Sequence, residues 1–524
     1  MSYKYSSLRY GGYRNLHEGA TRGRRLGEWG NEYTSSLDET CSDLHILRNR
    51  VRTLRRDNAW TGRGNQVDKS NMIGTGIRPV ATTSNKEFNT SVADVLEEWS
   101  RDVSYEFPNT NLYSLQLQIR QTKRESGECF VIIKRTRLDR ANNLVPLKFQ
   151  VLESDYCPLT MNISLNNGNR VVNGVELDSK KRVVAYHFYK SHPRDFNQMA
   201  IERGQFVRVP VKDVLHYVDR DRPTQLRGKP KISNSIVTAR TFDTYNDAEL
   251  VRKKSRASLI GTIERDHYDE NDYKFDPMTG QPLTEDAGVP LMDLQDGTFH
   301  ALMAGEHLNM ASSDDAGVGF KDYQKFQLMQ IAVSHGVPYQ LLTGDWSEIN
   351  DRVWRAIFNQ YKREVQQEQE LGIIPMICDP IYREFIDRAI LSGAIQMPDF
   401  ENDYSRYKVK HRTQTWEYIH PEQDVNSDIK NLQAGLTSRE AIISKRGEHG
   451  VTVETIDAER EADKKRELDK NLRSLANYSK LENEFDINDD GVIDIAQKGE
   501  TPQEDNGSAP VDVGEVDKSN ARLK

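Results

Sequence analysis

The chain has 524 residues, of which 36% are hydrophobic and 29% are charged, as in an ordinary globular protein with a large polar surface. This length leaves room for several subdomains. No stretch of about 18 apolar residues is present, which excludes a membrane-spanning helix. The N-terminus lacks the apolar core of a secretory signal, so we expect a cytoplasmic chain with no membrane partner.

The net charge of −8 is concentrated at the C-terminus. Residues 481–524 include twelve acidic and four basic residues, and residues 1–480 are neutral. We expect 481–524 to form an acidic disordered tail. Strong binding to DNA through its phosphates requires clustered Lys and Arg. The neutral body therefore excludes a basic nucleic-acid clamp and favours a protein that touches DNA weakly or lets it slide.

The first part of the chain divides into an arm and a helix. Residues 1–37 are rich in Gly, Tyr, Arg and Ser, which predicts a flexible N-terminal arm that orders only against a partner. From Asp38 to Trp60, apolar residues at helical spacing with arginines around them predict one amphipathic helix with a basic face. That face is either solvated or turned toward DNA or a protein partner.

The character of the sequence changes to short β-prone runs between Leu115 and Asp219. Val, Ile, Phe and Tyr are dense in these runs, and turn residues separate them. The runs are CFVIIKR, PLKFQVLES, RVVNGVELDSKKRVVAYHFYK and QFVRVPVKDVLHYV. They predict a mixed or antiparallel sheet.

A polar run without Pro or Gly, from Ser233 to Ser258, predicts the next helix. It ends on four cations, Arg252, Lys253, Lys254 and Arg256. Cations at a helix C-terminus suit the macrodipole, and a basic zone beside a DNA path is the alternative. In residues 259–310 the strand-like segments LIGTIE and TFHALM enclose a Gly/Pro/Asp-rich centre, which indicates a small inserted module.

Helices follow this insert. One is expected from Tyr323 to Ser334 with its stop at Gly336, and another begins near Ile349 with an apolar stripe at i, i+4 spacing. Pro375 is expected to interrupt it.

The Asp379-Pro380 pair predicts a new helix start, and that helix should reach Leu391 and stop at Gly393. Thr437 and Glu440 form a capping box, and the charged run from Val453 to Leu475 predicts a last helix.

Motifs for bond chemistry are absent from the sequence. It contains no P-loop, HExxH, nucleophile elbow or paired CxxC, so neither an ATP-driven motor nor an enzyme is expected. The four cysteines, Cys41, Cys129, Cys157 and Cys378, lie far apart and are expected to be reduced packing residues.

One segment has the form of a calcium loop. In FDINDDGVIDIAQ, Gly491 permits the sharp turn, and the ligand positions of an EF-hand loop are taken by Asp486, Asn488, Asp490, Val492 and Asp494. Gln497 stands where a bidentate Glu is expected, which weakens the site. Two interpretations stay open: a Ca²⁺ site, the one cofactor the sequence suggests, or an acidic turn in a solvated tail.

Several of these segments, in this order, resemble the portal proteins of lambda-like phages. The resemblance extends from about Arg24 to Leu475. The shared order of the segments supports it more than any single segment does. The most specific pieces are GECFV around Cys129, LESDYC ending at Cys157, GVELDSKKRVVAYHF from Gly174, VLHYVDRDRPTQLRGKP from Val214, YNDAELVRKKSRASL from Tyr245, HGVPYQLLTGDWSEIN from His335 and NLQAGLTSREAIISKRG from Asn431.

The resemblance implies an α+β portal-protein fold with a β-rich wing, a two-helix stem, a small α/β clip and a helical crown, assembled as a ring that is usually a homododecamer. The expected parts, in chain order, are the arm 1–37, the wing 38–232, stem helix 233–258, the clip 259–310, the linker and second stem helix 311–336, the tunnel loop 337–350, the tunnel helix and return to the wing 351–400, the crown and C-terminal helices 401–480, and the tail 481–524.

The same resemblance implies a structural role and a set of partners. The ring would stand at one vertex of the capsid, in the virion after assembly in the host cytoplasm, as the channel for packaging and ejecting double-stranded DNA. The implied partners are the terminase large subunit, the major capsid and scaffold proteins, and a head-completion or tail adaptor protein.

We expect two groups of residues to approach DNA in such a channel. One is in the tunnel loop: Gln340, Thr343, Trp346 and Glu348. The other is the basic group Arg252, Lys253, Lys254 and Arg256 near the stem.

Two other functions compete with this interpretation. The first is another oligomeric head–tail connector or adaptor protein, although adaptors are generally small. The second is a nuclease or other hydrolase that would use Glu264, Asp266 and His267 in ERDHYD, a segment that otherwise forms a polar loop.

Overall fold

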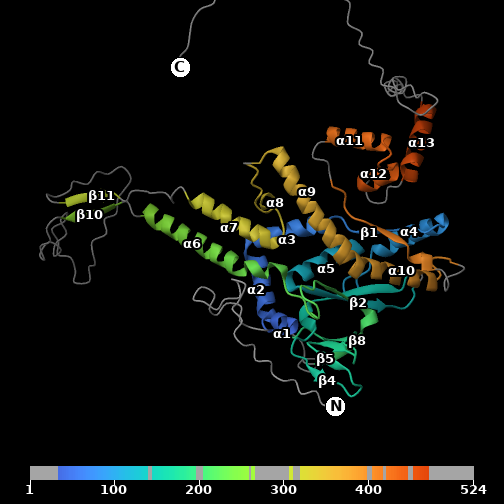
Figure 1. Cartoon of the computed structure of the whole chain (residues 1–524), viewed down its shortest axis with the longest axis horizontal. Coiled ribbons are helices and arrows are strands. Elements are labelled where there is room, and N and C mark those ends of the chain that lie inside the picture. The colour runs from blue at the N-terminus through green and yellow to red at the C-terminus, as the bar shows by residue number, and fades with distance from the viewer. Residues whose placement is uncertain are drawn as a thin grey trace, which may run out of the picture. The chain divides into compact units, whose positions relative to one another are not determined.

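The computed structural model describes residues 34–139, 144–195, 205–258, 261–265, 306–310, 319–347, 349–397, 404–416, 421–446 and 453–470. Helices and strands are mixed along these stretches, so the α+β class is confirmed (Figure 1). The chain divides into a larger unit, Met1–Thr437 with Ser444–Gly450, and a smaller one, Ser438–Ile443 with Val451–Lys524. Among the described helices, none has the length and apolar character needed to cross a membrane.

The predicted helix from Asp38 to Trp60 is in fact parts of three helices. They are α1 (Ser36–Cys41), α2 (Leu44–Asp57) and α3 (Ala59–Met72). The break after α2 is at Asn58, whose backbone is extended and whose side chain accepts a hydrogen bond of 2.7 Å from the Thr61 N–H. Asn58 therefore caps α3. The expected arm lies outside the described residues up to residue 33, and α1 already begins within the range assigned to it.

Two helices precede the β-rich region and were not predicted. They are α4 (Lys86–Ser100) and α5 (Leu112–Ser126). Asn111 caps the start of α5 with its side chain, and Gly127 ends it with a left-handed φ of 86°. The expected β structure is therefore wrong from Leu115 to Gly127, and the strands begin at Glu128.

The four β-prone runs are strands, and their pairing is antiparallel, but they belong to two sheets rather than to the single sheet that the sequence predicted. The first has the order β3-β2-β9, with β2 (Glu128–Arg135) in its centre between β3 (Leu147–Leu152) and β9 (Val214–Val218). The second has the order β4-β5-β6-β7-β8, with strands β4 (Ile163–Ser164), β5 (Arg170–Val172), β6 (Val175–Leu177), β7 (Val183–Tyr189) and β8 (Phe206–Pro210). Phe130 of β2 packs edge-on against Tyr186 and Phe188 of β7, which joins the two sheets through an aromatic core.

Helices α6 (Ile236–Ser258) and α7 (Phe320–His335) lie side by side (Figure 1). The Gln324 side chain donates a hydrogen bond of 2.9 Å to Asn246, and the Tyr245 and Tyr323 rings are 5.0 Å apart. Gly336 ends α7 with a left-handed φ of 65°, as predicted. The bounds of α6 and α7 therefore agree closely with those of the two expected helices.

A two-stranded antiparallel sheet separates α6 from α7 in the sequence. It pairs β10 (Gly261–Arg265) with β11 (Glu306–Met310). The predicted strand LIGTIE corresponds to β10, whereas TFHALM lies outside the described residues.

The chain stays helical from Asp351 to Leu391, which contradicts the predicted interruption at Pro375. After the short α8 (Tyr339–Thr343), α9 (Asp351–Glu368) continues through wide π-helical turns (Gln369–Cys378) into α10 (Asp379–Leu391). Proline clashes with the carbonyl four residues earlier in an α-helix, and the wider turns relieve that clash. Asp379 is the first residue of α10, as predicted, but its backbone is already helical, so it does not cap a free helix end; the predicted end at Leu391 is confirmed.

The remaining elements are spread along the chain. Strand β1 (Arg78–Ala81) pairs with β12 (Val409–Arg412), and 3₁₀ turns occur at Ser154–Tyr156, Val211–Asp213, Lys231–Ser235 and Tyr404–Tyr407. The C-terminal helices are α11 (Pro421–Gln433), α12 (Arg439–Arg446) and α13 (Val453–Lys470). The cap of α12 is Ser438, whose Oγ accepts from the Ala441 N–H at 3.1 Å, one residue after the predicted Thr437.

All four cysteines have free thiols, as expected. Cys129, Cys157 and Cys378 are buried and Cys41 is partly buried.

Candidate functional site

The predicted tunnel loop contains the short helix α8. Gln340 and Thr343 belong to it, and the Thr343 hydroxyl donates a hydrogen bond of 2.9 Å to the Tyr339 carbonyl. The same hydroxyl accepts from the Asp345 N–H at 3.2 Å. Thr343 thus holds the loop together internally. Glu348, the fourth residue expected there, lies outside the described residues.

Trp346 joins the loop to α9 through aromatic contacts. Its ring meets Trp354 edge-on with centroids 4.7 Å apart, and Trp354 stacks on Phe358 at 5.1 Å. Trp346 nevertheless remains 48% exposed. The loop therefore presents one large flat side chain to its surroundings from a fixed position.

The predicted basic group lies on the last turns of α6. Arg252 pairs with Glu249 at 2.5 Å, and the Lys253 ammonium lies 5.3 Å from the centre of the Phe320 ring. Lys254 is exposed, and the Arg256 side chain lies outside the described residues. Part of the positive charge is therefore balanced within the chain, and its position at the helix C-terminus suits the macrodipole.

The structure does not bring the tunnel-loop and basic groups together. The Lys253 contact places the end of α6 beside Phe320, the first residue of α7, whereas α8 follows the other end of α7. Sixteen helical residues separate these ends, which corresponds to about 24 Å. The two groups therefore lie toward opposite ends of α7.

A buried ionic network lies where α7 meets the β-rich part of the larger unit. We call it the Asp68 cluster, and its members are Asp68, Arg120, Lys123, Arg124, Tyr217, His335 and Glu368. Arg120 donates two hydrogen bonds of 2.8 Å to Asp68 and one of 2.5 Å to Glu368. Arg124 donates to Asp68 at 2.6 Å and to the His335 carbonyl at 3.1 Å. The cluster ties α3, α5 and the ends of α7 and α9 together.

The electrostatics of the cluster favour one set of protonation states. Burial alone would raise the pKa of Asp68, but Arg120 and Arg124 outweigh it and lower this pKa to about 2. Burial and then the neighbouring Arg124 lower the pKa of His335 to about 3. Asp68 is therefore an anion and His335 a neutral ring at neutral pH.

Glu128 is the centre of a second buried network, between α2 and the sheets. Its carboxylate accepts from Arg48 at 2.7 Å, from Arg227 at 2.8 Å and from the Gly228 N–H at 3.0 Å, and His216 lies 3.0 Å away. Burial alone would raise the pKa of Glu128, but Arg227 and Arg48 hold it well below its ordinary value. The carboxylate is enclosed by two guanidinium groups and a backbone N–H, which is the arrangement of a structural anchor rather than of a reactive site.

The predicted basic face of α2 is largely neutralised too. Arg52 pairs with Asp155 at 2.5 Å, and Arg55 pairs with Glu125 at 2.8 Å. Both contacts are within the chain, so they favour the solvated and structural interpretation over a DNA-facing surface.

Sequence reasoning did not find either network. The spacing of Arg120, Lys123 and Arg124 on one helix face was the available signal, since three cations on a buried face require anions opposite them. Nothing in the sequence identified those anions.

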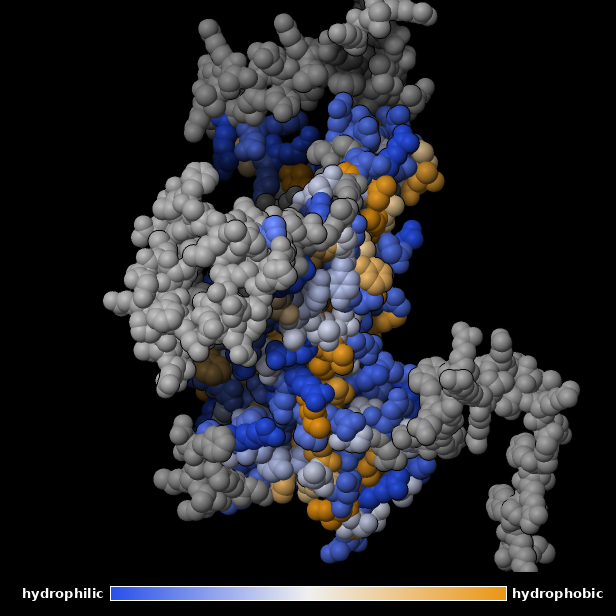
Figure 2. Space-filling view, turned by 90° about the vertical axis from the view of Figure 1, so that its left-hand side faces the viewer, coloured by the Kyte–Doolittle hydropathy of each residue, from blue (hydrophilic) through white to orange (hydrophobic). Residues whose placement is uncertain are grey.

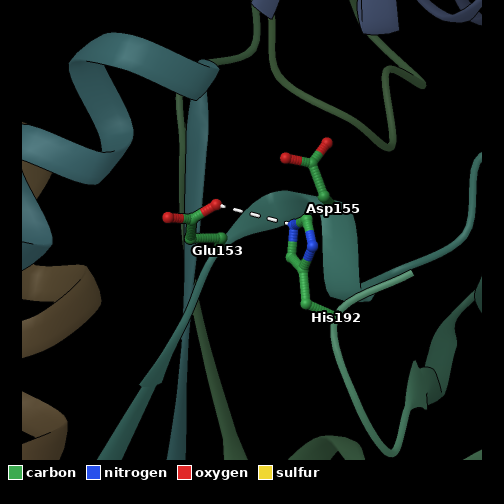
Figure 3. Close-up of side chains that lie close together, drawn as sticks. All are labelled: Glu153, Asp155 and His192. Atoms are coloured by element: carbon green, nitrogen blue, oxygen red, sulfur yellow. Dashed lines mark ion pairs between the residues drawn. The ribbon is translucent and has the colours of Figure 1, made fainter. Parts of the chain in front are cut away.

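Glu153, Asp155 and His192 form the one group of three cation-ligand side chains found among the described residues (Figure 3). Glu153 and His192 turn toward each other with 3.9 Å between Oε2 and Nε2. Arg52 already lies 2.5 Å from Asp155 and 3.4 Å from Glu153. The guanidinium supplies the positive charge that these carboxylates need.

The other sequence candidates are only partly within the described residues. Glu264 lies on β10 opposite His307 of β11, whereas Asp266 and His267 are outside the described part. The EF-hand-like residues, Asp486 to Asp494, are outside it as well, so calcium binding stays a prediction.

Comparisons with known proteins identify a matching family and a similar phage protein. Residues 22–369 match the model of the family described as phage portal protein, lambda family. A probable portal protein of Halomonas phage phiHAP-1 is 23% identical over 416 residues, which cover 77% of this chain and 78% of that protein.

Solved structures with lower identity resemble the chain as well. The neck of a native gene transfer agent particle, computed with twelvefold symmetry, has a TM-score of 0.42 at 15% identity and covers 75% of this chain and 91% of its own. An HK97-family phage portal protein from Corynebacterium diphtheriae has a TM-score of 0.27 at 11% identity and covers 70% and 95%. The assignment rests on the sequence match, which extends over more than half of the residues: the chain belongs to the lambda family of phage portal proteins.

Proposed function

We propose that copies of this chain close into a ring, expected to be a dodecamer, at one vertex of the capsid, and that double-stranded DNA passes through its hole during packaging and ejection. The match of residues 22–369 to the portal family is the observation that carries this proposal. That family is structural rather than enzymatic. Terminase would dock on the ring first, and a head-completion or tail adaptor protein would follow.

The parts of the chain suit this plan. The sheets of β2 to β9 would belong to the wing, α6 and α7 to the stem, and the hairpin of β10 and β11 to the clip. The segment around α8 would be the tunnel loop, with α9 behind it. Helices can act as struts through the capsid opening, while an insert between them projects to meet other proteins.

A channel for DNA of any sequence must limit both base recognition and phosphate attraction. Residues 1–480 are neutral overall, so the ring would hold phosphates weakly. The cations at the end of α6 and Trp346 of the loop would touch DNA at two heights without gripping it. Within the described residues, the most deeply buried charges pair with one another and are unavailable to DNA.

Imaging and mass measurement of the purified full-length chain test the proposal. We expect closed rings with a central hole and a mass that is a whole-number multiple of the chain. A stable monomer, or an assembly without an aperture, would overturn it. Incubation with DNA and divalent metal tests the hydrolase alternative, and we expect the DNA to stay intact.

A further inference from the structure

We propose that the outer face of the β1–β12 sheet binds the phosphate backbone of double-stranded DNA, as a contact surface separate from the end of α6 and from the tunnel loop. The inference rests on the proposed function, which supplies DNA as the partner. We call this surface the basic ribbon, and its members are Arg78 of β1, Lys410 and Arg412 of β12, and Lys408 just before β12.

The inner face of this sheet is anchored to the core beside α4 (Figure 1). Pro79 lies opposite His411, and Ala81 lies opposite Val409. Pro79 and His411 line a small cavity together with side chains of α4, α5 and α10, and the other two residues pack against the same core. His411 Nε2 also lies 2.6 Å from Oδ1 of Asp379 on α10. The sheet is therefore a fixed platform.

The outer face carries the cations because successive side chains of a strand point to opposite sides. Arg78 lies opposite Arg412, and Lys410 lies opposite Val80. Lys408 continues the row two residues before Lys410, and both lysines are exposed. The residues on this face include four cations and no acid.

The charges of the basic ribbon are not balanced in the way of other basic groups. Arg52 of α2, for example, pairs with a carboxylate at 2.5 Å. Arg78, Lys408 and Lys410 have no such partner within the part of the chain that the structure describes. The Arg78 guanidinium lies instead 4.7 Å from the centre of the Tyr113 ring. Stacking on an aromatic ring holds a guanidinium in place and leaves its charge available to an anion.

The cross-strand pair of Arg78 and Arg412 is a second indication of a bound anion. Like charges directly opposite each other destabilise a strand pair. This sheet has only four paired residues on each strand, so such a cost weighs on it. An anion over the pair would offset the repulsion. Residues that break a local rule of stability are typical of functional sites.

The spacing of the cations suits a phosphate backbone. Alternate residues of a strand are about 6.6 Å apart, so Lys408, Lys410 and Arg412 form a straight row. Phosphates of one DNA strand follow each other at about 3.4 Å along the helix axis, so each cation can reach a phosphate in any register. Contacts to phosphates carry no sequence information. The basic ribbon would therefore bind DNA of any sequence.

The composition of the face favours a polyanion over a protein partner. On the side of the molecule shown in Figure 2, hydrophobic side chains reach the surface among hydrophilic ones. On the outer face of β1–β12, Val80 is the one apolar side chain, and it is half-buried. Protein–protein interfaces have an apolar centre that is depleted in charged residues, and this face has the opposite composition.

The acidic residues 481–524 of the same chain are the other polyanion to consider. They include twelve Asp and Glu, but these are unevenly spaced and interrupted by Pro and Gly. Fixing such a segment on the sheet would cost conformational entropy at every residue. A DNA duplex already holds its phosphates in a regular row, so DNA is the favoured occupant.

Salt-dependent DNA binding by the full-length chain tests the inference. The probe is a mixed-sequence duplex, with affinity measured between about 50 and 200 mM salt. We expect Lys408→Gln with Lys410→Gln to weaken binding equally for duplexes of different sequence and to make the slope of log K against log salt shallower by about 2, since two phosphate contacts are lost. Lys408→Arg with Lys410→Arg should keep the slope of the parent.

The matched control neutralises two exposed lysines elsewhere, Lys180→Gln with Lys212→Gln. This pair should keep the slope of the parent. An equal loss in the control would overturn the inference, because net charge rather than this surface would then determine binding. A parent chain without measurable affinity at about 50 mM salt would overturn it too.

Imaging of the same preparations separates this inference from the proposed function. If the unaltered chain forms no ring, the proposed function fails. If rings form and the neutralised lysine pair keeps the slope of the parent, the basic ribbon does not bind DNA while the ring stands. That second result is also the one expected if residues 481–524 occupied the ribbon.

Lysine acetylation read by mass spectrometry gives a second measurement on the unaltered chain. The duplex should protect Lys408 and Lys410 from the reagent and leave Lys180 and Lys212 as reactive as before. Equal reactivity of all four lysines with and without DNA would contradict the inference.

Discussion

Arg120 holds Asp68 through two hydrogen bonds of 2.8 Å, from Nε to Oδ2 and from Nη2 to Oδ1, although the two residues are 52 positions apart in the chain. This forked geometry fixes both the distance and the plane of the pair. The same guanidinium donates to Glu368 at the end of α9. Since α9 also carries Trp354, against which Trp346 rests, the Asp68 cluster fixes the helix that supports the proposed tunnel loop.

We predict that Asp68→Asn lowers the free energy of unfolding by about 3–5 kcal/mol, because it removes the anion that two buried guanidinium groups share and leaves Arg120 with Glu368 alone. Urea denaturation of the full-length chain measures the change. Glu97→Gln is the matched control, since the Glu97–Arg101 pair is exposed and its loss should not be measurable. Equal losses in the two variants would show that the cluster adds no stability of its own.

The pH dependence of stability should depend in part on His335. Its pKa falls from an ordinary 6.5 to about 3 in the folded chain, so folding requires the neutral ring. The stability from this group is complete above pH 6.5 and is lost progressively as the pH falls toward 3. We expect the melting temperature of His335→Gln to decline less than that of the parent between about pH 7 and pH 4.

Two other histidines should cause part of the decline in melting temperature that remains in His335→Gln. Burial also lowers the pKa of His216 and of His411, so both act with the same sign. A His335→Gln variant that loses stability as steeply as the parent over this interval would contradict the assignment.

Local patterns predicted much of the fold. β2 is a dense run of β-branched and aromatic residues, and Gly336 supplies the left-handed turn that ends α7, so neither needs information from the rest of the chain. Helix α5 was not predicted because its buried face includes Arg120 and Lys123, and these charged residues interrupt the apolar periodicity of a helix. The predicted interruption at Pro375 was wrong because a proline normally breaks a helix. Here the surrounding packing selects wider turns that tolerate the proline.

The two buried networks could not be predicted for a related reason. Glu368 lies 248 positions from Arg120, and only the folded chain brings them together. The apolar residues of α6 and α7 predicted helices correctly, but Phe326 and Leu328 look alike in the sequence. Which of them faces inward depends on the partner helix, so the structure was needed to show that Leu328 is buried and Phe326 exposed.

Gly64 on α3 should be intolerant of a side chain because the His335 ring packs against it. A Cβ atom there would lie 2.6 Å from Nδ1 and 2.8 Å from Cγ of that ring. We expect Gly64→Ala to lose roughly 1–3 kcal/mol through overpacking, partly offset by a helix-propensity gain of about 1 kcal/mol.

Gly62 on the same helix provides the control. Its Cβ would meet the Arg55 carbonyl oxygen at 3.4 Å, an ordinary contact, so Gly62→Ala should be neutral or stabilising in thermal unfolding. Loss of stability in both variants would indicate a general intolerance of α3 instead of the specific contact with His335.

Reversing charge at the end of α6 should separate assembly from DNA handling. Lys253→Glu with Lys254→Glu places two anions where the proposed channel has cations, so packaged DNA would meet repulsion at that height. We expect rings of normal mass but fewer DNA-filled heads when the variant replaces the parent chain in a phage. Lys86→Glu, an exposed cation on α4, is the control and should leave DNA filling unchanged. Normal filling by the double variant would mean that these lysines serve the helix terminus alone, because their charge would then have no effect on the passing phosphates.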